Sequence, residues 1–247
     1  MSTWILLRGL MRETRHWGDF PQQLQTRFPD DRVIGLEWPG NGSLYRQKSL
    51  NSIKEMAGYC QQTLIQQRAS QPYHVIAISM GAMAALEWVR LRPVDVASCT
   101  LINTSLAAFN PAHQRLRARN WHRLVALALL GPTERERVIF DLCSNQRDAA
   151  ALSAWQQYAK ECPAYFTNVL RQLWAASQYR GDRSPPSVPT LLLNSAQDRL
   201  VDPACSASIA RAWQCPLKTH PYAGHDLPLD APEWVLDQLT AWLAQKN

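Results

Sequence analysis

Ser79 is the residue whose type and position most directly suggest chemistry. It ends a run of strand-forming residues, HVIAI, and small residues follow it at once. A serine at a sharp turn from a strand into a helix sits in a strained backbone position, and close packing there requires small neighbours. Ala77, Gly81 and Ala82 meet that requirement. The turn also directs the first helical amides at whatever the serine binds, so the Met80 amide is a natural oxyanion donor.

Apolar stretches that predict strands alternate along the chain with stretches that predict helices. The predicted strands are 4–9, 32–38, 74–79, 97–103, 189–195 and 216–220, and the clearest helices are 16–28, 50–68, 80–91, 203–213 and 232–247. Continuous apolar strands separated by helices indicate a parallel sheet covered on both faces. In such α/β sheets, functional residues collect at the carboxyl ends of the strands.

Residues 104–187 interrupt this alternation. They are helical in pattern, rich in Arg, Trp and Gln, and end in the loop GDRSPPSVP. We expect a helical cap insertion over the site at 104–187, and one core domain formed by 1–103 and 188–247. Its large apolar residues should be mostly core, with some lining a pocket: Leu106, Phe109, Trp121, Leu130, Trp155, Tyr158, Phe166 and Trp174.

The segment AISMG around Ser79 resembles the G-x-S-x-G nucleophile elbow of the α/β-hydrolase superfamily, with a small alanine for the first glycine. A serine nucleophile needs a base and an acid that orients the base, and this family has them in the chain order Ser, Asp or Glu, His. Asp198 in QDRLVDP and His225 in AGHD resemble the family's acid and base loops. The resemblance therefore implies a catalytic triad of Ser79, Asp198 and His225.

Further similarities extend over almost the whole chain. LLRGL resembles the family's strand followed by H-G-x, whose third residue, here Leu10, would supply the second oxyanion amide. EWPGNGS and the helix after DAPEW are also typical of the family. Arg8 departs from the family's histidine, and the first strand corresponds to the third of the full fold. We therefore expect about six parallel strands, with the antiparallel N-terminal pair missing.

Each proposed site residue has a structural alternative. Ser79 would be an ordinary helix N-cap if the rest of the pattern were accidental. His220 is the rival of His225, but it lies inside a predicted strand. Asp202 is the rival of Asp198, but it precedes a proline and looks like the N-cap of helix 203–213. Asp226, beside the base, is interpreted as a solvated or loop-stabilising charge.

The basic segment NPAHQRLRARNWHRL allows two interpretations of its arginines. Arg115, Arg119 and Arg123 have the i, i+4, i+8 spacing of one helical face. They would form a solvated face of a cap helix, or attract an acidic substrate or carrier. The second interpretation is similar to carboxylesterases of the pimeloyl-acyl-carrier-protein methyl ester esterase type, which makes acyl carrier protein a candidate partner. Arg8 and Arg12 would add to the substrate-binding set.

Composition limits the class of protein further. The chain of 247 residues is 46% apolar and 19% charged, which suits one soluble globular protein with a full core. Its first apolar run is too short for a signal peptide or membrane span, so we expect a cytoplasmic protein without a membrane partner. The net charge of +6 permits an acidic partner, but no motif favours nucleic acid. The six cysteines lack metal-site spacing and are expected to be reduced.

We therefore expect a serine hydrolase that cleaves a carboxylic ester or thioester through an acyl-enzyme, without metal or organic cofactor. Its substrate would be a small ester or acyl compound, and its oligomeric state by default a monomer. Two alternatives remain open. One is a lyase or synthase that uses the same residues for proton abstraction, as in the menaquinone-pathway synthase of this family. The other is a non-catalytic binding protein on the same scaffold.

Overall fold

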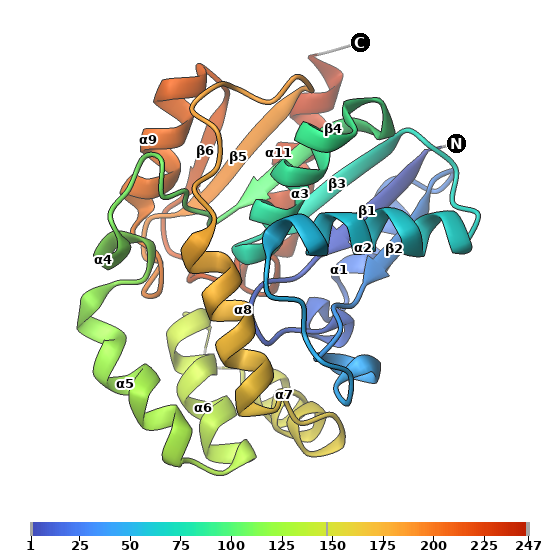
Figure 1. Ribbon diagram of the computed structural model, residues 1–247. Coiled ribbons are helices and arrows are strands. Elements are labelled where there is room, and N and C mark those ends of the chain that lie inside the picture. Colours follow the sequence, from blue (N-terminus) through green and yellow to red (C-terminus); the bar gives the residue numbers. More distant parts are fainter. Residues whose placement is uncertain (1, 147, 246–247) are drawn as a thin grey trace.

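The computed structural model describes residues 2–146 and 148–245. At its centre is a six-stranded sheet in the order β2-β1-β3-β4-β5-β6, and every neighbouring pair is parallel (Figure 1). The strands are β1 (Thr3–Leu7), β2 (Arg32–Leu36), β3 (Tyr73–Ile78), β4 (Val96–Ile102), β5 (Thr190–Ser195) and β6 (Leu217–His220). The predicted α/β class and the six parallel strands are confirmed.

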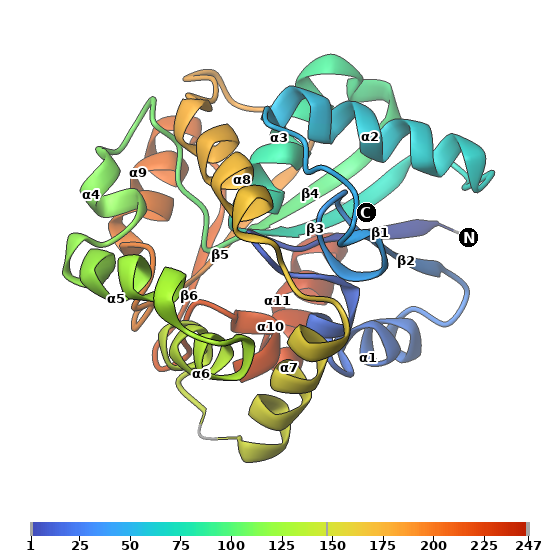
Figure 2. The ribbon, with the colours of Figure 1, turned by 60° about the horizontal axis from the view of Figure 1, so that its bottom comes forward.

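Helices cover both faces of the sheet, which is why the inner strands β1, β3, β4 and β5 are almost entirely buried. The edge strands β2 and β6 carry exposed polar residues. Helices α2 and α3 lie on one side, and α1 and α11 lie on the other (Figure 2). The helices of the core are α1 (Phe20–Arg27), α2 (Ile53–Gln66), α3 (Met80–Leu91), α9 (Pro203–Trp213), α10 (Leu227–Asp230) and α11 (Pro232–Ala244). No helix among the described residues is long and apolar enough to cross a bilayer.

Strand β1 shows how the two layers are built. Its side chains alternate between faces, so Ile5 and Leu7 join the cluster beneath α2 and α3, whereas Trp4 and Leu6 join the cluster beneath α1 and α11. The strand is buried on both sides because each face meets a helix layer. Its carboxyl end is therefore fixed beside the carboxyl end of β3, where Ser79 follows.

The chain between β4 and β5 forms five further helices, which lie together below the sheet in Figure 1. They are α4 (Ala112–Arg115), α5 (Trp121–Ala126), α6 (Pro132–Cys143), α7 (Ala149–Glu161) and α8 (Phe166–Gln178). A small apolar cluster that includes Ile139, Phe140 and Trp155 packs against Met11 and Leu200 of the core. The cap segment is thus attached to the core around the ends of the strands.

Two local predictions were wrong. The predicted helix 16–28 is a 3-10 turn (Thr14–Trp17) and then α1, separated at Gly18 with a positive φ of 56°. The basic segment is not one helix either, because α4 ends at Arg115 and a 3-10 turn (Ala118–Asn120) precedes α5. Arg115, Arg119 and Arg123 therefore lie on three separate elements and share no helical face.

Candidate active site

Ser79 occupies a strained turn between β3 and α3. Its backbone has φ 56° and ψ −121°, and its side chain makes no capping hydrogen bond to the helix. The turn is held to β4, because the Ser79 amide donates to the Ile102 carbonyl at 2.9 Å and the Thr104 hydroxyl donates to the Ser79 carbonyl at 3.0 Å. A non-glycine residue in this conformation is costly and points to function. The N-cap interpretation of this serine is wrong.

Two glycines let β1 approach this turn. A Cβ atom on Gly81 would lie 2.6 Å from the carbonyl oxygens of both Leu7 and Arg8. A Cβ atom on Gly9 would lie 3.0 Å from the Cβ of Ser79 and 3.5 Å from its Oγ. The end of β1 therefore passes directly beside the serine, and only glycine allows that approach.

Asp198 and His225 lie together at the ends of β5 and β6. Nδ1 of His225 is 2.7 Å from Oδ2 of Asp198, and both side chains are buried. The other carboxylate oxygen accepts the amides of Leu200 and Val201 at 2.7 and 2.9 Å. These bonds fix the carboxylate, which in turn orients the ring so that Nε2 is the nitrogen left for chemistry.

The two rival residues, Asp202 and His220, make local structural contacts. The Asp202 carboxylate accepts the Ala204 amide at 3.0 Å and caps α9, as its place before Pro203 predicted. Nδ1 of His220 accepts the amide of Ala223 at 2.9 Å, and its ring packs edge-on against Trp234. Both rivals stabilise local structure.

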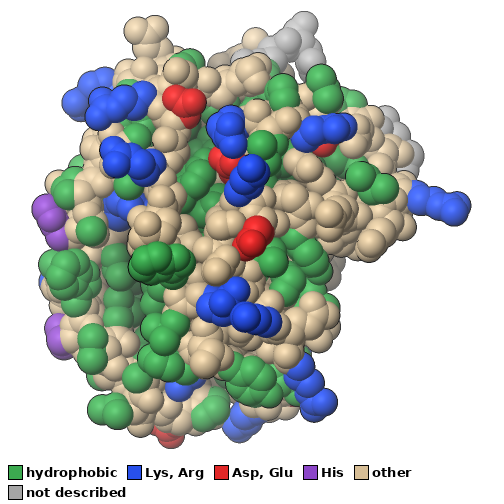
Figure 3. Space-filling view, in the orientation of Figure 1, with side chains coloured by type: hydrophobic (Ala, Val, Ile, Leu, Met, Phe, Trp, Pro, Cys, Tyr) green, Lys and Arg blue, Asp and Glu red, His purple; other side chains and the backbone are tan. Residues whose placement is uncertain are grey.

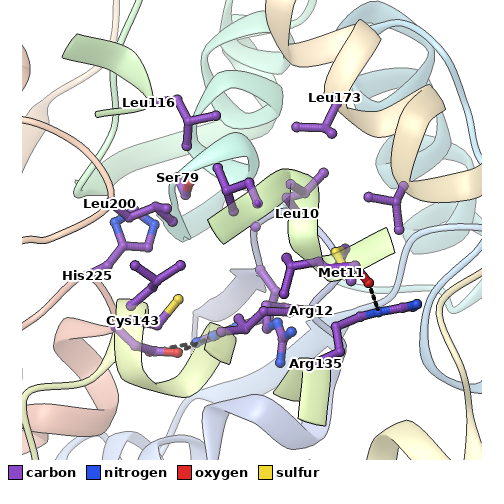
Figure 4. A pocket seen from close by; sticks show the side chains of 18 of the residues that line it. Leu10, Met11, Arg12, Ser79, Leu116, Arg135, Cys143, Leu173, Leu200 and His225 are labelled. Atoms are coloured by element: carbon purple, nitrogen blue, oxygen red, sulfur yellow. Dashed lines mark hydrogen bonds and ion pairs between the residues drawn. The ribbon is translucent and has the colours of Figure 1, made fainter. Parts of the chain in front are cut away.

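Ser79 and His225 open into one cavity of about 370 Å³ (Figure 4). Most of its wall is apolar and comes from the cap: Leu116, Leu124, Val125, Leu127, Ala128, Ile139, Leu142, Phe166, Val169, Leu170 and Leu173. Of the eight large cap residues considered from sequence, Phe166 is among the lining residues. Burial raises the pKa of the lining thiol of Cys143 to about 12, so this thiol is uncharged near neutral pH and is no rival nucleophile.

The two backbone amides predicted to hold an oxyanion belong to Met80 and Leu10. Met80 is the first residue of α3, and amides of a first helical turn have no partner within the helix. In the turn after β1, the Met11 amide donates to Oε1 of Gln172 at 3.0 Å and the Arg12 amide to the Gly9 carbonyl at 3.3 Å. The Leu10 amide has no acceptor among the described residues, and Leu10 lines the cavity.

A sequence profile of the alpha/beta hydrolase family matches residues 5–238. The chain belongs to the alpha/beta hydrolase family. The expected superfamily is thereby confirmed, and the narrower resemblance to the pimeloyl-acyl-carrier-protein methyl ester esterase type remains a proposal.

Solved structures share the fold over nearly the whole chain. An enol-lactonase from Burkholderia xenovorans LB400 has a TM-score of 0.81 at 14% identity, with 98% of this chain and 91% of that chain covered. A thermophilic esterase from Thermogutta terrifontis has a TM-score of 0.78 at 20% identity, with 99% and 90% covered. A bacterial membrane phospholipase A has a TM-score of 0.80 at 19% identity, with 99% and 79% covered. A search of curated protein sequences finds no significant match.

In this alpha/beta hydrolase, Arg8 and Arg12 are neutralised by carboxylates. Arg8 is buried and forms a two-pronged ion pair with Asp226, one prong at 3.0 Å, while its guanidinium lies 4.9 Å from the ring centre of Trp17. Asp226 is therefore a buried partner, which agrees with its interpretation as a loop-stabilising charge and rules out a solvated one. Arg12 forms a similar pair with Glu136 of α6, at 2.7 and 3.1 Å.

The structure does not bring Arg119 and Arg123 to the hydrolase cavity. Arg119 is exposed and lines a separate shallow depression with Asp198 and Arg199. Nη2 of Arg123 lies 3.8 Å from Oδ2 of Asp141 in α6. Neither is among the residues that line the cavity at Ser79.

Asn103 is a site residue that the sequence reasoning missed. It directly follows β4, has a positive φ of 46°, and is buried. Its Nδ2 donates to the His225 carbonyl at 2.7 Å and to Oγ of Ser195 at 3.1 Å, and its Oδ1 accepts the Ser195 amide at 2.9 Å. It therefore ties the ends of β5 and of the base loop together. The signal that the sequence offered was an asparagine directly after an apolar strand.

Proposed function

We propose that this protein is a serine hydrolase of carboxylic esters or thioesters, with Ser79 as nucleophile, His225 as base and Asp198 as the acid that orients it. The observation that carries the proposal is the hydrogen bond between His225 and Asp198. His225 lines the same cavity as Ser79, whose backbone is strained and whose side chain does not cap the helix. These three residue types at the ends of β3, β5 and β6 meet the requirements for an activated hydroxyl.

In the proposed mechanism, Nε2 of His225 takes the proton of Ser79 as the hydroxyl attacks the substrate carbonyl. The Met80 and Leu10 amides hold the oxygen of the tetrahedral intermediate, and loss of one such donor typically costs about 10²–10³ in rate. His225 then gives the proton to the leaving alcohol or thiol. Water repeats the sequence on the acyl-enzyme and releases the acid.

The cavity favours an ester with an apolar acyl part. Its wall beyond Ser79 and His225 consists mostly of Leu, Ile, Val and Phe side chains, and a volume of about 370 Å³ suits a small ligand. Three arginines line the cavity, and each already has partners. Arg8 and Arg12 are paired with Asp226 and Glu136, and Arg135 donates to the carbonyls of Leu127 and Leu130. This argues against the elimination chemistry that an arginine-lined pocket would suit. Of the four predicted substrate-binding arginines, Arg119 is the exposed one, and it is the one that would contact an acidic carrier protein.

The proposal is tested with a fluorophosphonate probe and p-nitrophenyl esters of increasing acyl length. We expect the parent chain to be labelled and the Ser79→Ala variant to remain unlabelled, with kcat/KM rising from acetyl to medium-length acyl esters as apolar contacts accumulate. A folded parent chain that takes no label would overturn the proposal and favour a non-catalytic binding protein. Labelling without ester turnover would leave the nucleophile intact and refute the assigned substrate class.

A further inference from the structure

The entrance to the cavity carries an unusual number of exposed apolar side chains. On one side, Trp121, Val125 and Leu129 follow each other at four-residue intervals along α5 and the 3-10 turn after it (Leu127–Leu129). On the other side, Phe166, Leu170, Leu173 and Trp174 form one face of α8. All seven are exposed, with Leu129 at 89% and Trp174 at 59%. We call these seven residues the mouth surface.

The mouth surface is continuous with the catalytic cavity. Val125, Phe166, Leu170 and Leu173 are exposed to solvent and also line the cavity that contains Ser79. Hydrophobic side chains gather over α5 and α8 on either side of a hollow (Figure 3). A patch of this kind on a soluble protein marks an interaction site. Whatever covers it also covers the route to the serine.

The two chain segments that carry the mouth surface are basic. Residues 104–133 and 162–181, which include α5 and α8, contain no Asp or Glu. The same two segments contain the arginines Arg115, Arg117, Arg119, Arg123, Arg171 and Arg180. Two of these arginines have acidic partners from other elements, Arg117 with Asp202 and Arg123 with Asp141. Apolar helix faces with tryptophan and leucine, flanked by arginines, match helices that lie in the headgroup layer of a lipid surface.

We propose that the mouth surface docks on an anionic lipid layer, from which an apolar ester passes directly into the cavity. A folded protein or a second copy of the chain on this face would close the entrance, whereas a lipid layer is itself a source of apolar substrate. The arginines supply attraction to the headgroups and the seven apolar side chains supply insertion. Only the passage of substrate rests on the proposed esterase function.

This differs from the expectation, drawn from the sequence, that the protein has no membrane partner. Residues 121–129 and 166–174 are separated along the chain, so neither segment is apolar for long enough to suggest a membrane. The fold places them on opposite sides of one opening. The combined surface exists only in the folded protein.

The test is co-sedimentation of the full chain with vesicles of phosphatidylcholine alone or mixed with phosphatidylglycerol. The Ser79→Ala variant is used, so that binding is measured whether or not the esterase proposal holds. We expect binding to the mixed vesicles, weakened about tenfold or more by Leu129→Ser with Trp174→Ser. We expect a loss of about tenfold from Arg119→Gln with Arg123→Gln, and weakening by salt.

Matched controls distinguish binding through the mouth surface from non-specific hydrophobic and electrostatic binding elsewhere on the protein. Ile65→Ser with Val94→Ser removes apolar side chains that are 69% and 77% exposed outside the mouth surface. Arg32→Gln with Arg68→Gln removes the same net charge from exposed positions elsewhere. Both control pairs should bind within about twofold of the parent, since only nearby charges and inserted side chains contribute. In an otherwise active chain, Leu129→Ser with Trp174→Ser should leave turnover of a dissolved short ester unchanged.

Three results would overturn the proposal. The first is no sedimentation with the mixed vesicles. The second is an equal loss of binding in the control pairs. The third is a chain that light scattering shows to be dimeric and that Leu129→Ser with Trp174→Ser makes monomeric, which would assign the surface to a second copy. If the first result is accompanied by binding of purified acyl carrier protein, the mouth surface belongs to an acidic protein instead.

Discussion

Arg8 and Asp226 form a buried two-pronged ion pair that joins the two loops on either side of the proposed reaction centre. Arg8 directly precedes Gly9, which approaches Ser79, and Asp226 directly follows His225. The Asp226 amide also donates to the Cys143 carbonyl at the end of α6, at 2.7 Å. The ion pair therefore joins the turn that carries the Leu10 amide to the loop of His225, and the backbone bond of Asp226 joins that loop to the cap.

Breaking this pair from one side should be strongly destabilising. Asp226→Asn leaves a buried guanidinium without its carboxylate, and we expect a loss of about 3–5 kcal/mol in the free energy of unfolding, measured in urea. Arg8→Met with Asp226→Leu should recover most of that loss, because two apolar side chains leave no buried charge. Arg27→Gln, which breaks the exposed pairs to Glu233 and Asp237, should cost less than about 1 kcal/mol. A double variant as unstable as the sum of its single changes would contradict this account.

Asp198 and Asp202 offer a matched comparison four residues apart. Asp198→Asn removes the acceptor that holds the His225 tautomer, so kcat should fall by about 10³–10⁴ with the fold retained. Asp202→Asn keeps a capping side chain and should leave kcat within about twofold, with a small stability change. The measurement is turnover of a medium-length p-nitrophenyl ester together with thermal unfolding. An equal loss of kcat in both variants would refute the assignment of the acid.

Gly81 and Gly58 test the close approach of β1 to the serine turn. Alanine at Gly81 would put a Cβ atom 2.6 Å from two carbonyl oxygens of β1 and the residue after it, so β1 must shift. We expect a loss of about 1–3 kcal/mol in stability and a larger fractional loss of kcat/KM, because the Leu10 amide moves with the strand. Nothing lies within 4 Å of a Cβ atom on Gly58 in α2. Gly58→Ala should therefore stabilise the fold by about 0.5–1 kcal/mol with unchanged turnover.

Local patterns in the sequence predicted the sheet and the turn at Ser79, and the resemblance to the family's acid and base loops pointed to Asp198 and His225. Apolar runs, turn residues and small neighbours are set within about ten residues, and the alternation of strands and helices then places the strand ends together. The Asp202 cap was predictable for the same reason, since a cap needs only the next turn of chain.

The contacts that connect distant segments were not predictable. Arg8 pairs with Asp226, which is 218 residues away in the sequence, and Asn103 donates to the carbonyl of His225, which is 122 residues away. Nothing local to Arg8 or Arg12 indicates that each has a buried carboxylate partner, so exposed substrate contacts were the natural expectation. The prediction of one arginine face was wrong for a related reason. The spacing of Arg115, Arg119 and Arg123 indicates one face only if a single helix spans them, and turns divide the segment.

His16 makes the junction between the core and the cap sensitive to acid. Its ring lies 2.8 Å from Nη1 of Arg12 and packs edge-on against Trp155 and Tyr158 of α7. Burial, followed by the positive charge of Arg12, lowers the pKa of His16 well below its usual value of 6.5. The unfolded chain therefore binds a proton below about pH 6.5 that the folded chain does not.

The sign of the pH dependence follows from that difference. The contribution of His16 to the free energy of unfolding should be fully present above about pH 6.5. Below that pH, protonation of His16 in the unfolded chain should lower the free energy of unfolding by up to about 1.4 kcal/mol per pH unit. His16→Gln retains an acceptor for Arg12 but cannot titrate, so its unfolding free energy should depend less steeply on pH between about 5 and 6.5. The same substitution at the exposed His122 is the matched control for the loss of a histidine. Urea unfolding at several pH values measures both, and parallel slopes for parent and His16→Gln would show that His16 is protonated in the folded protein.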